Sequence, residues 1–193
     1  MDRVAVLVPV KAFAEAKLRL ASVLTDAERK TLARRMAARV VVAAAPLPVA
    51  VVCDDPNVRA WAESMGAQVV WRPGRGLNAA VQDGVAALAA DGFERVLVAH
   101  ADLPLATALA WVADGGGVTL IPDRHDDGTN AACVPASAGF RFAYGPGSFA
   151  RHCAEAARLG FDLRVVRDAA LGWDVDVPDD LDFDRTTFGA PCP

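Results

Sequence analysis

Positively charged side chains follow the first apolar segment of the chain. Val4 to Val10 is a short β-branched run typical of a buried strand, and the next ten residues, KAFAEAKLRL, contain Lys11, Lys17 and Arg19. Ligands of open α/β sheets bind beyond the carboxyl ends of the strands, where three cations would offset the charge of a triphosphate. A solvated basic loop has the same composition. The segment contains neither GxGxxG nor a P-loop motif.

A carboxylate follows a second apolar run. The sequence HADLPL, residues 100–105, places Asp102 directly after residues 96–101, at the expected ligand-binding edge of the sheet. A carboxylate in that position can hold a hard cation, or it can begin a turn before Pro104. We interpret His100 as a hydrogen-bonding residue at the strand end, because no second histidine stands at a ligand spacing.

Two further carboxylates alternate near the end of the chain, in WDVDVPDDL at residues 173–181. If this segment is extended, Asp174 and Asp176 project to the same face and repel each other unless a cation lies between them. The pattern therefore predicts a metal site. Asp179 and Asp180 fall in the first turn of an expected helix, where they suit its dipole and receive a structural role.

Two polar loops interrupt the later, otherwise apolar half of the sequence. They are PDRHDDGTNAA at 122–132 and YGPGSFARH at 144–152, and we expect Ser148 to cap the helix that follows. Backbone N–H groups, hydroxyls and a helix N-terminus together make an anion site that suits a phosphate. Two ordinary surface turns would also account for these loops.

The elements that must position these residues alternate along the chain. A capping box at Thr25 and Glu28 predicts a helix of four to five turns. Further helices are expected at 58–65, 78–90, 107–114, 148–159 and near Pro178, between strands at 4–10, 49–53, 68–71, 96–101, 118–121, 131–134 and 163–166. We therefore predict one α/β domain over residues 1–193, a Rossmann-like α/β/α sandwich with a mostly parallel, partly mixed sheet.

Composition favours a small-molecule partner. The 193 residues are 53% hydrophobic, and 20 basic and 24 acidic side chains are interspersed, giving a net charge of -4 and no cationic face for nucleic acid or an anionic membrane. The cysteines at 53, 133, 153 and 192 form no CxxC pair and no zinc-ligand spacing, as expected of reduced thiols. No signal peptide or segment of membrane-spanning length is apparent, so we expect a cytoplasmic protein.

Six motifs together resemble the 2-phospho-L-lactate or phosphoenolpyruvate guanylyltransferases of deazaflavin coenzyme (F420) biosynthesis. They occur in that family's order across most of the chain: VPVKxFxxAKxRL at 8–20, LNAAV at 77–81, ADLPL at 101–105, DGTNA at 127–131, YGPGSFARH at 144–152 and DVDVPDDL at 174–181. The resemblance implies a relative of the nucleotidyltransferases that include molybdenum-cofactor guanylyltransferase, with a nucleotide-diphospho-sugar transferase-like fold.

The resemblance also implies an activity and roles for residues. GTP and a phosphorylated three-carbon acid would be the substrates, with Mg²⁺ as the cofactor. The implied sets are Lys17, Arg19 and Asp102 for catalysis; Pro9, Lys11, Lys17, Arg19 and Asn78 for the nucleotide, Asn78 reading the base; Thr129, Gly145 and Ser148 for the acceptor phosphate; and Asp102, Asp174 and Asp176 for the metal. Val177 replaces the family's usual threonine, so any contact of that hydroxyl is lost.

Other functions stay open on the sequence alone. Another nucleotidyltransferase of this fold could act on a sugar phosphate or molybdopterin, and Asp174-Val175-Asp176 matches the DxD motif of glycosyltransferases, although it lies late in the chain. A non-catalytic sensor of GTP or a phosphometabolite has less need of a metal site. The sequence does not distinguish 2-phospholactate, phosphoenolpyruvate and 3-phosphoglycerate, and it leaves open the number of magnesium ions and whether the protein is a homodimer.

Overall fold

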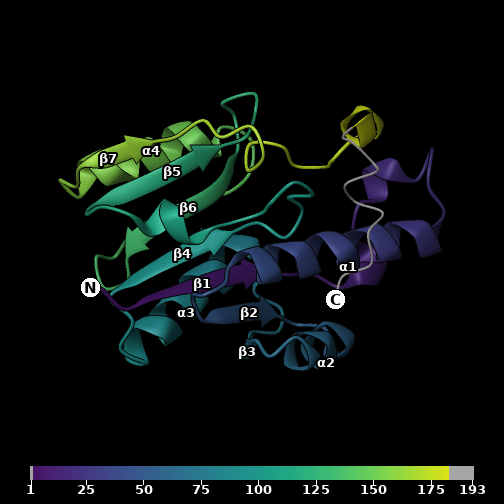
Figure 1. Ribbon diagram of the computed structural model, residues 1–193, viewed down its shortest axis with the longest axis horizontal. Helices are drawn as coiled ribbons and strands as arrows, with labels where there is room; N and C mark the ends of the chain where they lie inside the picture. Colours follow the sequence, from purple (N-terminus) through teal and green to yellow (C-terminus); the bar gives the residue numbers. More distant parts are fainter. Residues whose placement is uncertain (1, 183–193) are drawn as a thin grey trace.

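A computed structural model describes residues 2–182, in which seven strands form one sheet (Figure 1). The strand order is β3-β2-β1-β4-β6-β5-β7, and β6 alone is antiparallel to its neighbours. The expected mostly parallel, partly mixed sheet is confirmed. The strands are β1 (Val4–Pro9), β2 (Val49–Cys53), β3 (Gln68–Trp71), β4 (Arg95–Ala99), β5 (Val118–Pro122), β6 (Thr129–Pro135) and β7 (Leu163–Val165).

Helices cover both faces of the sheet and make three layers. The helices α1 (Asp26–Ala43) and α2 (Pro56–Ser64) bury apolar side chains against one face, and α3 (Gly76–Ala90) and α4 (Ser148–Arg158) do so against the other. Figure 1 shows α4 beside β5 and β7, at the opposite end of the sheet from α2. Alternate residues of β1 enter the two cores, which explains why this strand is apolar throughout.

Local hydrogen bonds explain where the helices begin. The Thr25 hydroxyl accepts from the Glu28 N–H at 3.3 Å and the Glu28 carboxylate accepts from the Thr25 N–H at 2.8 Å, so the predicted capping box is confirmed. Helix α2 begins before its predicted start at Val58, because Asp55 caps it and Pro56 suits the first helical position.

Some expected elements differ from the structure. The expected helix at 107–114 is a short 3₁₀ helix, η3 (Ala110–Ala113), and the last helix is also 3₁₀, η4 (Pro178–Asp182). Residues 174–176 belong to no strand of the sheet. The prediction that Ser148 caps α4 is wrong: Gly147 is the N-cap, with φ of 71°, a conformation that glycine adopts without strain.

A small third core joins the beginning of the chain to its end. Leu20, at the end of η2 (Leu18–Leu20), is fully buried with Met36 of α1 and Val175. The segment that precedes η4 therefore lies beside the loop after β1, as Figure 1 shows. That loop also contains η1 (Phe13–Glu15). Within residues 2–182, no helix is long and apolar enough to span a membrane.

Helix α3 lies close to β1 because it carries a glycine at the contact. A Cβ atom added to Gly84 would lie 2.6 Å from Cδ2 of Leu7, which is itself fully buried. Gly84→Ala should gain up to about 1 kcal/mol of helix propensity but lose about 1 to 3 kcal/mol to overpacking, so we expect net destabilisation in urea unfolding. Ala86→Gly, the reverse change on the exposed face, should also destabilise, by about 0.5 to 1 kcal/mol. A Gly84→Ala variant more stable than the parent would contradict the packing argument.

Candidate active site

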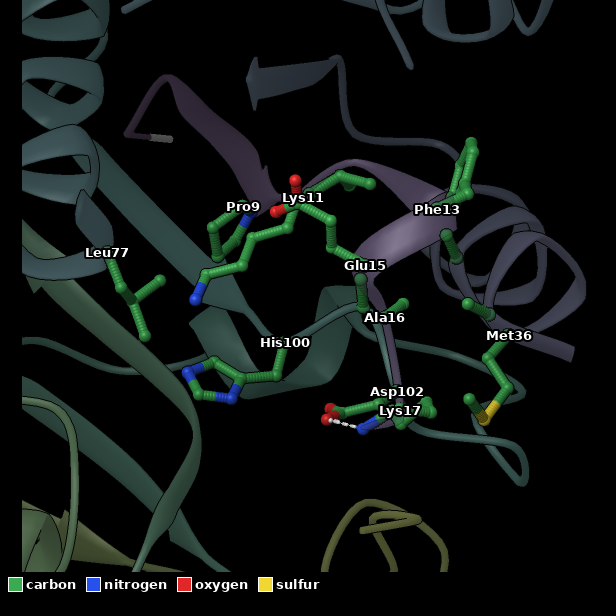
Figure 2. Close-up of a pocket in the computed structure, with 14 residues that line it drawn as sticks. Pro9, Lys11, Phe13, Glu15, Ala16, Lys17, Met36, Leu77, His100 and Asp102 are labelled. Carbon is green, nitrogen blue, oxygen red and sulfur yellow. Dashed lines mark hydrogen bonds and ion pairs between the residues drawn. The ribbon is translucent and has the colours of Figure 1, made fainter. Parts of the chain in front are cut away.

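A cavity of about 270 Å³ opens at the carboxyl ends of β1 and β4. Figure 2 shows Pro9 and Lys11 on one side of it, Leu77 and His100 on another, and Lys17 beside Asp102, below them in this view. Four residues named from the sequence, Pro9, Lys11, Lys17 and Asp102, thus line one cavity. It lies where ligands of open α/β sheets bind.

Lys17 joins two carboxylates that are distant in sequence. Its Nζ atom lies 2.6 Å from Oδ2 of Asp102 and 2.9 Å from Oδ1 of Asp176. Burial disfavours the ammonium, but the charges of Asp102 and Asp176 outweigh this effect and raise the pKa of Lys17. Burial likewise disfavours the charged form of Asp102, but the Lys17 ammonium holds the pKa of that carboxyl below its ordinary value. Lys17 and Asp102 are therefore both charged at neutral pH.

The backbone at Lys17 is itself unusual. Its φ is 56° and its ψ is 39°, in the left-handed region, which costs a residue with a Cβ atom on the order of 1 kcal/mol. The conformation aims the side chain at the two aspartates, with which it makes short ion pairs. The strain is thus located at the candidate active site.

Asp174 lies near the other two aspartates. Burial, together with the charges of Asp102 and Asp176, raises the pKa of Asp174 to about 6. Its Oδ1 atom is 3.5 Å from Nδ2 of Asn130 and 3.9 Å from Nη1 of Arg124. Asp174 is therefore near enough to Asp102 and Asp176 for their charges to act on it, and the shared metal site expected from the sequence stays a prediction.

The region has features that suit a cation. Oδ1 of Asp102 is buried and has no hydrogen-bond partner among residues 2–182, and burial, followed by the charges of Asp102 and Asp176, disfavours the ionised form of Asp174. Within residues 2–182 no three His, Cys, Asp or Glu side chains are arranged to hold a metal ion, and the Lys17 ammonium occupies the space between Asp102 and Asp176. The donor set is composed of hard oxygens, which Mg²⁺ prefers.

Asp180 holds the Asp176 backbone in place. Its buried carboxylate accepts from the N–H groups of Asp176 at 2.5 Å and Val177 at 2.8 Å, and it pairs with Arg124. Burial would raise the pKa of Asp180, but these hydrogen bonds and the guanidinium lower it. The structural role predicted for Asp180 therefore takes the form of a support for the segment that carries Asp174 and Asp176.

The two polar loops meet through Asp127. Its carboxylate accepts from the Gly147 N–H at 3.0 Å, and its carbonyl accepts from the Phe149 N–H at 3.0 Å. Thr129 and Ser148, one from each loop, are buried, and Gly145 has a φ of 115°. The structure thus brings the three residues predicted for the acceptor phosphate into two adjoining loops.

The start of α4 supplies fewer free donors than expected. The Ser148 N–H donates to the Gly145 carbonyl at 3.0 Å, and the Phe149 N–H is taken by Asp127. An anion near this helix would therefore depend on side-chain hydroxyls more than on these two backbone groups.

Two residues predicted to bind the nucleotide, Asn78 and Arg19, are not part of the lining of the cavity that contains the others. The Asn78 side chain bonds the backbone of Tyr144, accepting from its N–H at 2.7 Å and donating to its carbonyl at 3.4 Å. Asn78 thus braces the loop at Gly145 in this structure. Arg19 is mostly exposed, 3.9 Å from Asp176, and lines a neighbouring cavity with Lys17.

Sequence reasoning missed several supporting residues. Asn130 contacts Asp174, Asp127 joins the loops, and His152 hydrogen-bonds Thr129 at 3.0 Å. All three fall within the two polar loop sequences, so membership of those motifs was the available signal. The spacing of residues within the motifs does not indicate which side chains or backbone groups these three residues contact.

Solved structures place the fold in a known class. A protein from Desulfovibrio desulfuricans G20, assigned as a nucleotide-diphospho-sugar transferase, is similar with a TM-score of 0.73 at 17% identity, covering 94% of this chain and 85% of that one. Glucosyl-3-phosphoglycerate synthase from Mycobacterium tuberculosis, solved with Mg²⁺ and uridine diphosphate, gives a TM-score of 0.53 at 15% identity, covering 86% and 70%. At these identities the likeness shows the fold alone, that of the nucleotide-diphospho-sugar transferases.

Sequence comparison narrows this class to one family. Residues 4–183 match the model of the family described as guanylyl transferase CofC like. Phosphoenolpyruvate guanylyltransferase from Sphaerobacter thermophilus is 38% identical over 185 residues, covering 91% of this chain and 89% of the relative. The enzyme of the same name from Rubrobacter xylanophilus is 38% identical over 184 residues, covering 91% and 90%. The chain belongs to the CofC-like guanylyltransferase family, which confirms the resemblance seen in its motifs.

The raised pKa of Asp174 predicts a pH-dependent effect on stability. A carboxyl whose folded pKa of about 6 exceeds its unfolded value lowers the stability of the fold as the pH rises toward 6, and the full cost is present above that pH. In metal-free buffer, Asp174→Asn should raise the free energy of unfolding at pH 8 by on the order of 1 kcal/mol, allowing for solvent screening, and the gain should shrink toward pH 4.5. Asp162→Asn, at an exposed carboxylate elsewhere, is the control. A gain that did not vary with pH in urea titrations would refute this account.

Proposed function

We propose that this protein is a magnesium-dependent enzyme that transfers GMP from GTP to a phosphorylated three-carbon acid and releases pyrophosphate. The carrying observation is the cavity at the carboxyl ends of β1 and β4, which is lined by Lys17 and Asp102 and in which Lys17 also pairs with Asp176. Membership of the CofC-like family supports GTP as the donor. The relatives' name supports phosphoenolpyruvate as the acceptor, in a step of deazaflavin coenzyme biosynthesis.

The reaction needs charge compensation more than a general base. An oxygen of the acceptor phosphate attacks the α-phosphorus of GTP, and the bond from that phosphorus to the oxygen bridging the β-phosphate breaks. A phosphomonoester is mostly dianionic at neutral pH, so the nucleophile needs no deprotonation. The obstacle is repulsion between polyanions, which cationic side chains relieve. Lys11 and Lys17 line the cavity, and Arg19 lies beside it.

Asp102, Asp174 and Asp176 would hold Mg²⁺ in this proposal. The ion would neutralise charge on the phosphates and on the departing pyrophosphate. Oδ1 of Asp102, buried and without a hydrogen-bond partner among the described residues, is available as a ligand. Lys17 pairs with Oδ2 of Asp102 and Oδ1 of Asp176 in the free protein, and its ammonium would turn from them to a GTP phosphate when substrates bind.

The remaining site residues divide between the two substrates. Pro9, Lys11 and the cavity wall would accommodate the nucleotide, with Asn78 acting on it through the Tyr144 loop. Thr129, Gly145 and Ser148 would hold the acceptor.

We further propose that the whole chain is one nucleotidyltransferase domain and that it works in the cytoplasm. Analytical sedimentation would establish whether the protein is a homodimer.

Pyrophosphate release tests the proposed reaction directly. With GTP and Mg²⁺, phosphoenolpyruvate should be turned over, while pyruvate, lactate and glycerate should be inert because they lack the attacking phosphate. The assay should include 2-phospholactate, 3-phosphoglycerate and a sugar phosphate, and ATP in place of GTP. Equal turnover of ATP and GTP, or turnover of the sugar phosphate alone, would overturn the assignment.

A single carboxylate substitution tests the role of the aspartates. Asp102→Asn should lower kcat with GTP and phosphoenolpyruvate by at least about 100-fold, because a charged ligand is lost. The fold should persist, since Lys17 keeps its pair with Asp176. The control is Asp114→Asn, an exposed carboxylate outside the cavity. An Asp102→Asn enzyme with undiminished kcat and unchanged magnesium dependence would count against the proposed ligand set.

A further inference from the structure

A buried histidine stands behind the proposed acceptor site. His152 lies in α4 with 0% of its surface exposed. Its Nδ1 atom is 3.0 Å from the Thr129 hydroxyl oxygen, and its Nε2 atom accepts from the Ala143 N–H at 2.9 Å. Both ring nitrogens are therefore engaged by groups from the two polar loops.

These contacts determine where the imidazole proton lies. A backbone N–H can only donate, so the Nε2 atom facing Ala143 must be the unprotonated nitrogen. In the neutral ring the proton is then on Nδ1, which donates to the oxygen of Thr129. Burial, followed by the charge effects of His100 and Arg151, lowers the pKa of His152 to about 4, so the ring is neutral at physiological pH.

The packing around the ring fixes its orientation. The Tyr144 ring meets it edge-on with centroids 4.9 Å apart, and the rings of Phe140 and Phe142 lie 5.7 and 6.0 Å away. A ring flip would place a C–H group against the Ala143 N–H and leave a buried donor without an acceptor, which is costly. The tautomer and the orientation therefore support each other.

The position of the imidazole proton determines how the Thr129 hydroxyl can form hydrogen bonds. Its oxygen accepts a hydrogen bond from His152, and among the residues that the structure describes no acceptor is found for its own hydrogen. The next residue, Asn130, points its amide at Asp174, so Thr129 lies one residue from the group of aspartates. A hydroxyl held as a donor at this place suits a ligand atom that can only accept, such as an anionic oxygen.

We propose that His152 is a positioning residue that holds the Thr129 hydroxyl as a hydrogen-bond donor to an anionic oxygen of the acceptor acid. The inference rests on the proposed function, since it takes the acceptor to be a phosphoacid bound at Thr129. His152 itself does not touch the substrate. It acts by donating to the threonine oxygen, so that the hydroxyl hydrogen cannot be directed at the ring and is left for another acceptor.

Two substitutions separate the ring's two contacts. The amide nitrogen of Asn can take the place of Nδ1, so His152→Asn can keep the donor to Thr129. The amide oxygen of Gln can take the place of Nε2, so His152→Gln can keep the acceptor for Ala143 but presents no donor at the Nδ1 position. Binding of phosphoenolpyruvate is measured by calorimetry in Mg²⁺ and α,β-methylene-GTP, and binding of that nucleotide is measured separately.

We expect His152→Gln to weaken phosphoenolpyruvate binding about tenfold or more, the effect of a hydrogen bond to a charged group, and His152→Asn to weaken it much less. Nucleotide binding should be unchanged in both. Thr129→Val should weaken acid binding similarly, and adding His152→Gln to it should have little further effect. Equal losses in the two His152 variants, or a full additional loss in the Thr129→Val background, would overturn the proposal.

The wild-type protein supplies a check that does not depend on variants folding. Nitrogen-15 NMR of the histidine ring distinguishes the two neutral tautomers, and we expect Nδ1–H for His152; Nε2–H would overturn the proposal. Competition with inorganic phosphate and with pyruvate identifies the anionic group, because Thr129→Val should weaken only the one whose oxygen it contacts. Binding of phosphoenolpyruvate without turnover would refute the proposed reaction alone, whereas no binding to the wild type would refute both proposals.

Discussion

The ion pairs of Lys17 with Asp102 and Asp176 connect three parts of the molecule. They join the loop after β1, the loop after β4 and the segment before η4, which are 85 and 159 residues from Lys17 in sequence. Two carboxylates so near each other and partly buried would repel, and the ammonium makes their proximity tolerable. A left-handed backbone at Lys17 and the Asp180 carboxylate behind Asp176 are the local supports of this arrangement.

The reversed strand explains how the polar loop at residues 122–132 reaches the edge of the sheet where Lys17 and Asp102 lie. Because β6 runs antiparallel to β4, its first residues lie at the edge of the sheet where the parallel strands end. The His100 N–H bonds the Asn130 carbonyl there, at 2.9 Å. Thr129 and Asn130 then face different partners, His152 and Asp174, so two adjacent residues link the second polar loop to the carboxylates. An all-parallel sheet would have put the start of this strand at the opposite edge.

Much of the fold followed from local patterns, and much of the site did not. The limits of β2 and β3 matched their apolar runs, and the Thr25 capping box gave the start of α1, because these signals are local. The ligand edge was predicted from Lys17 and Asp102, whose positions after apolar strands are visible in sequence. The bonding of Asn78 to Tyr144 and of His152 to Thr129 was not, since these partners are set by tertiary packing. Ser148 was misplaced as a cap because a positive φ at Gly147 has no sequence signal distinct from that of any turn glycine.

The pairing of Lys17 with Asp176 has a consequence for synthesis of the chain on the ribosome. Strands β1 to β4 and the helices between them can form their contacts while later residues are still untranslated, because those contacts do not require the C-terminal segment. Lys17 and Asp102 can meet at that stage, but Asp176 and the buried Val175 can join them only after the segments of β5, β6 and β7 have been synthesised. A nascent chain that ends before Val175 would therefore carry most of the sheet and only part of the candidate site.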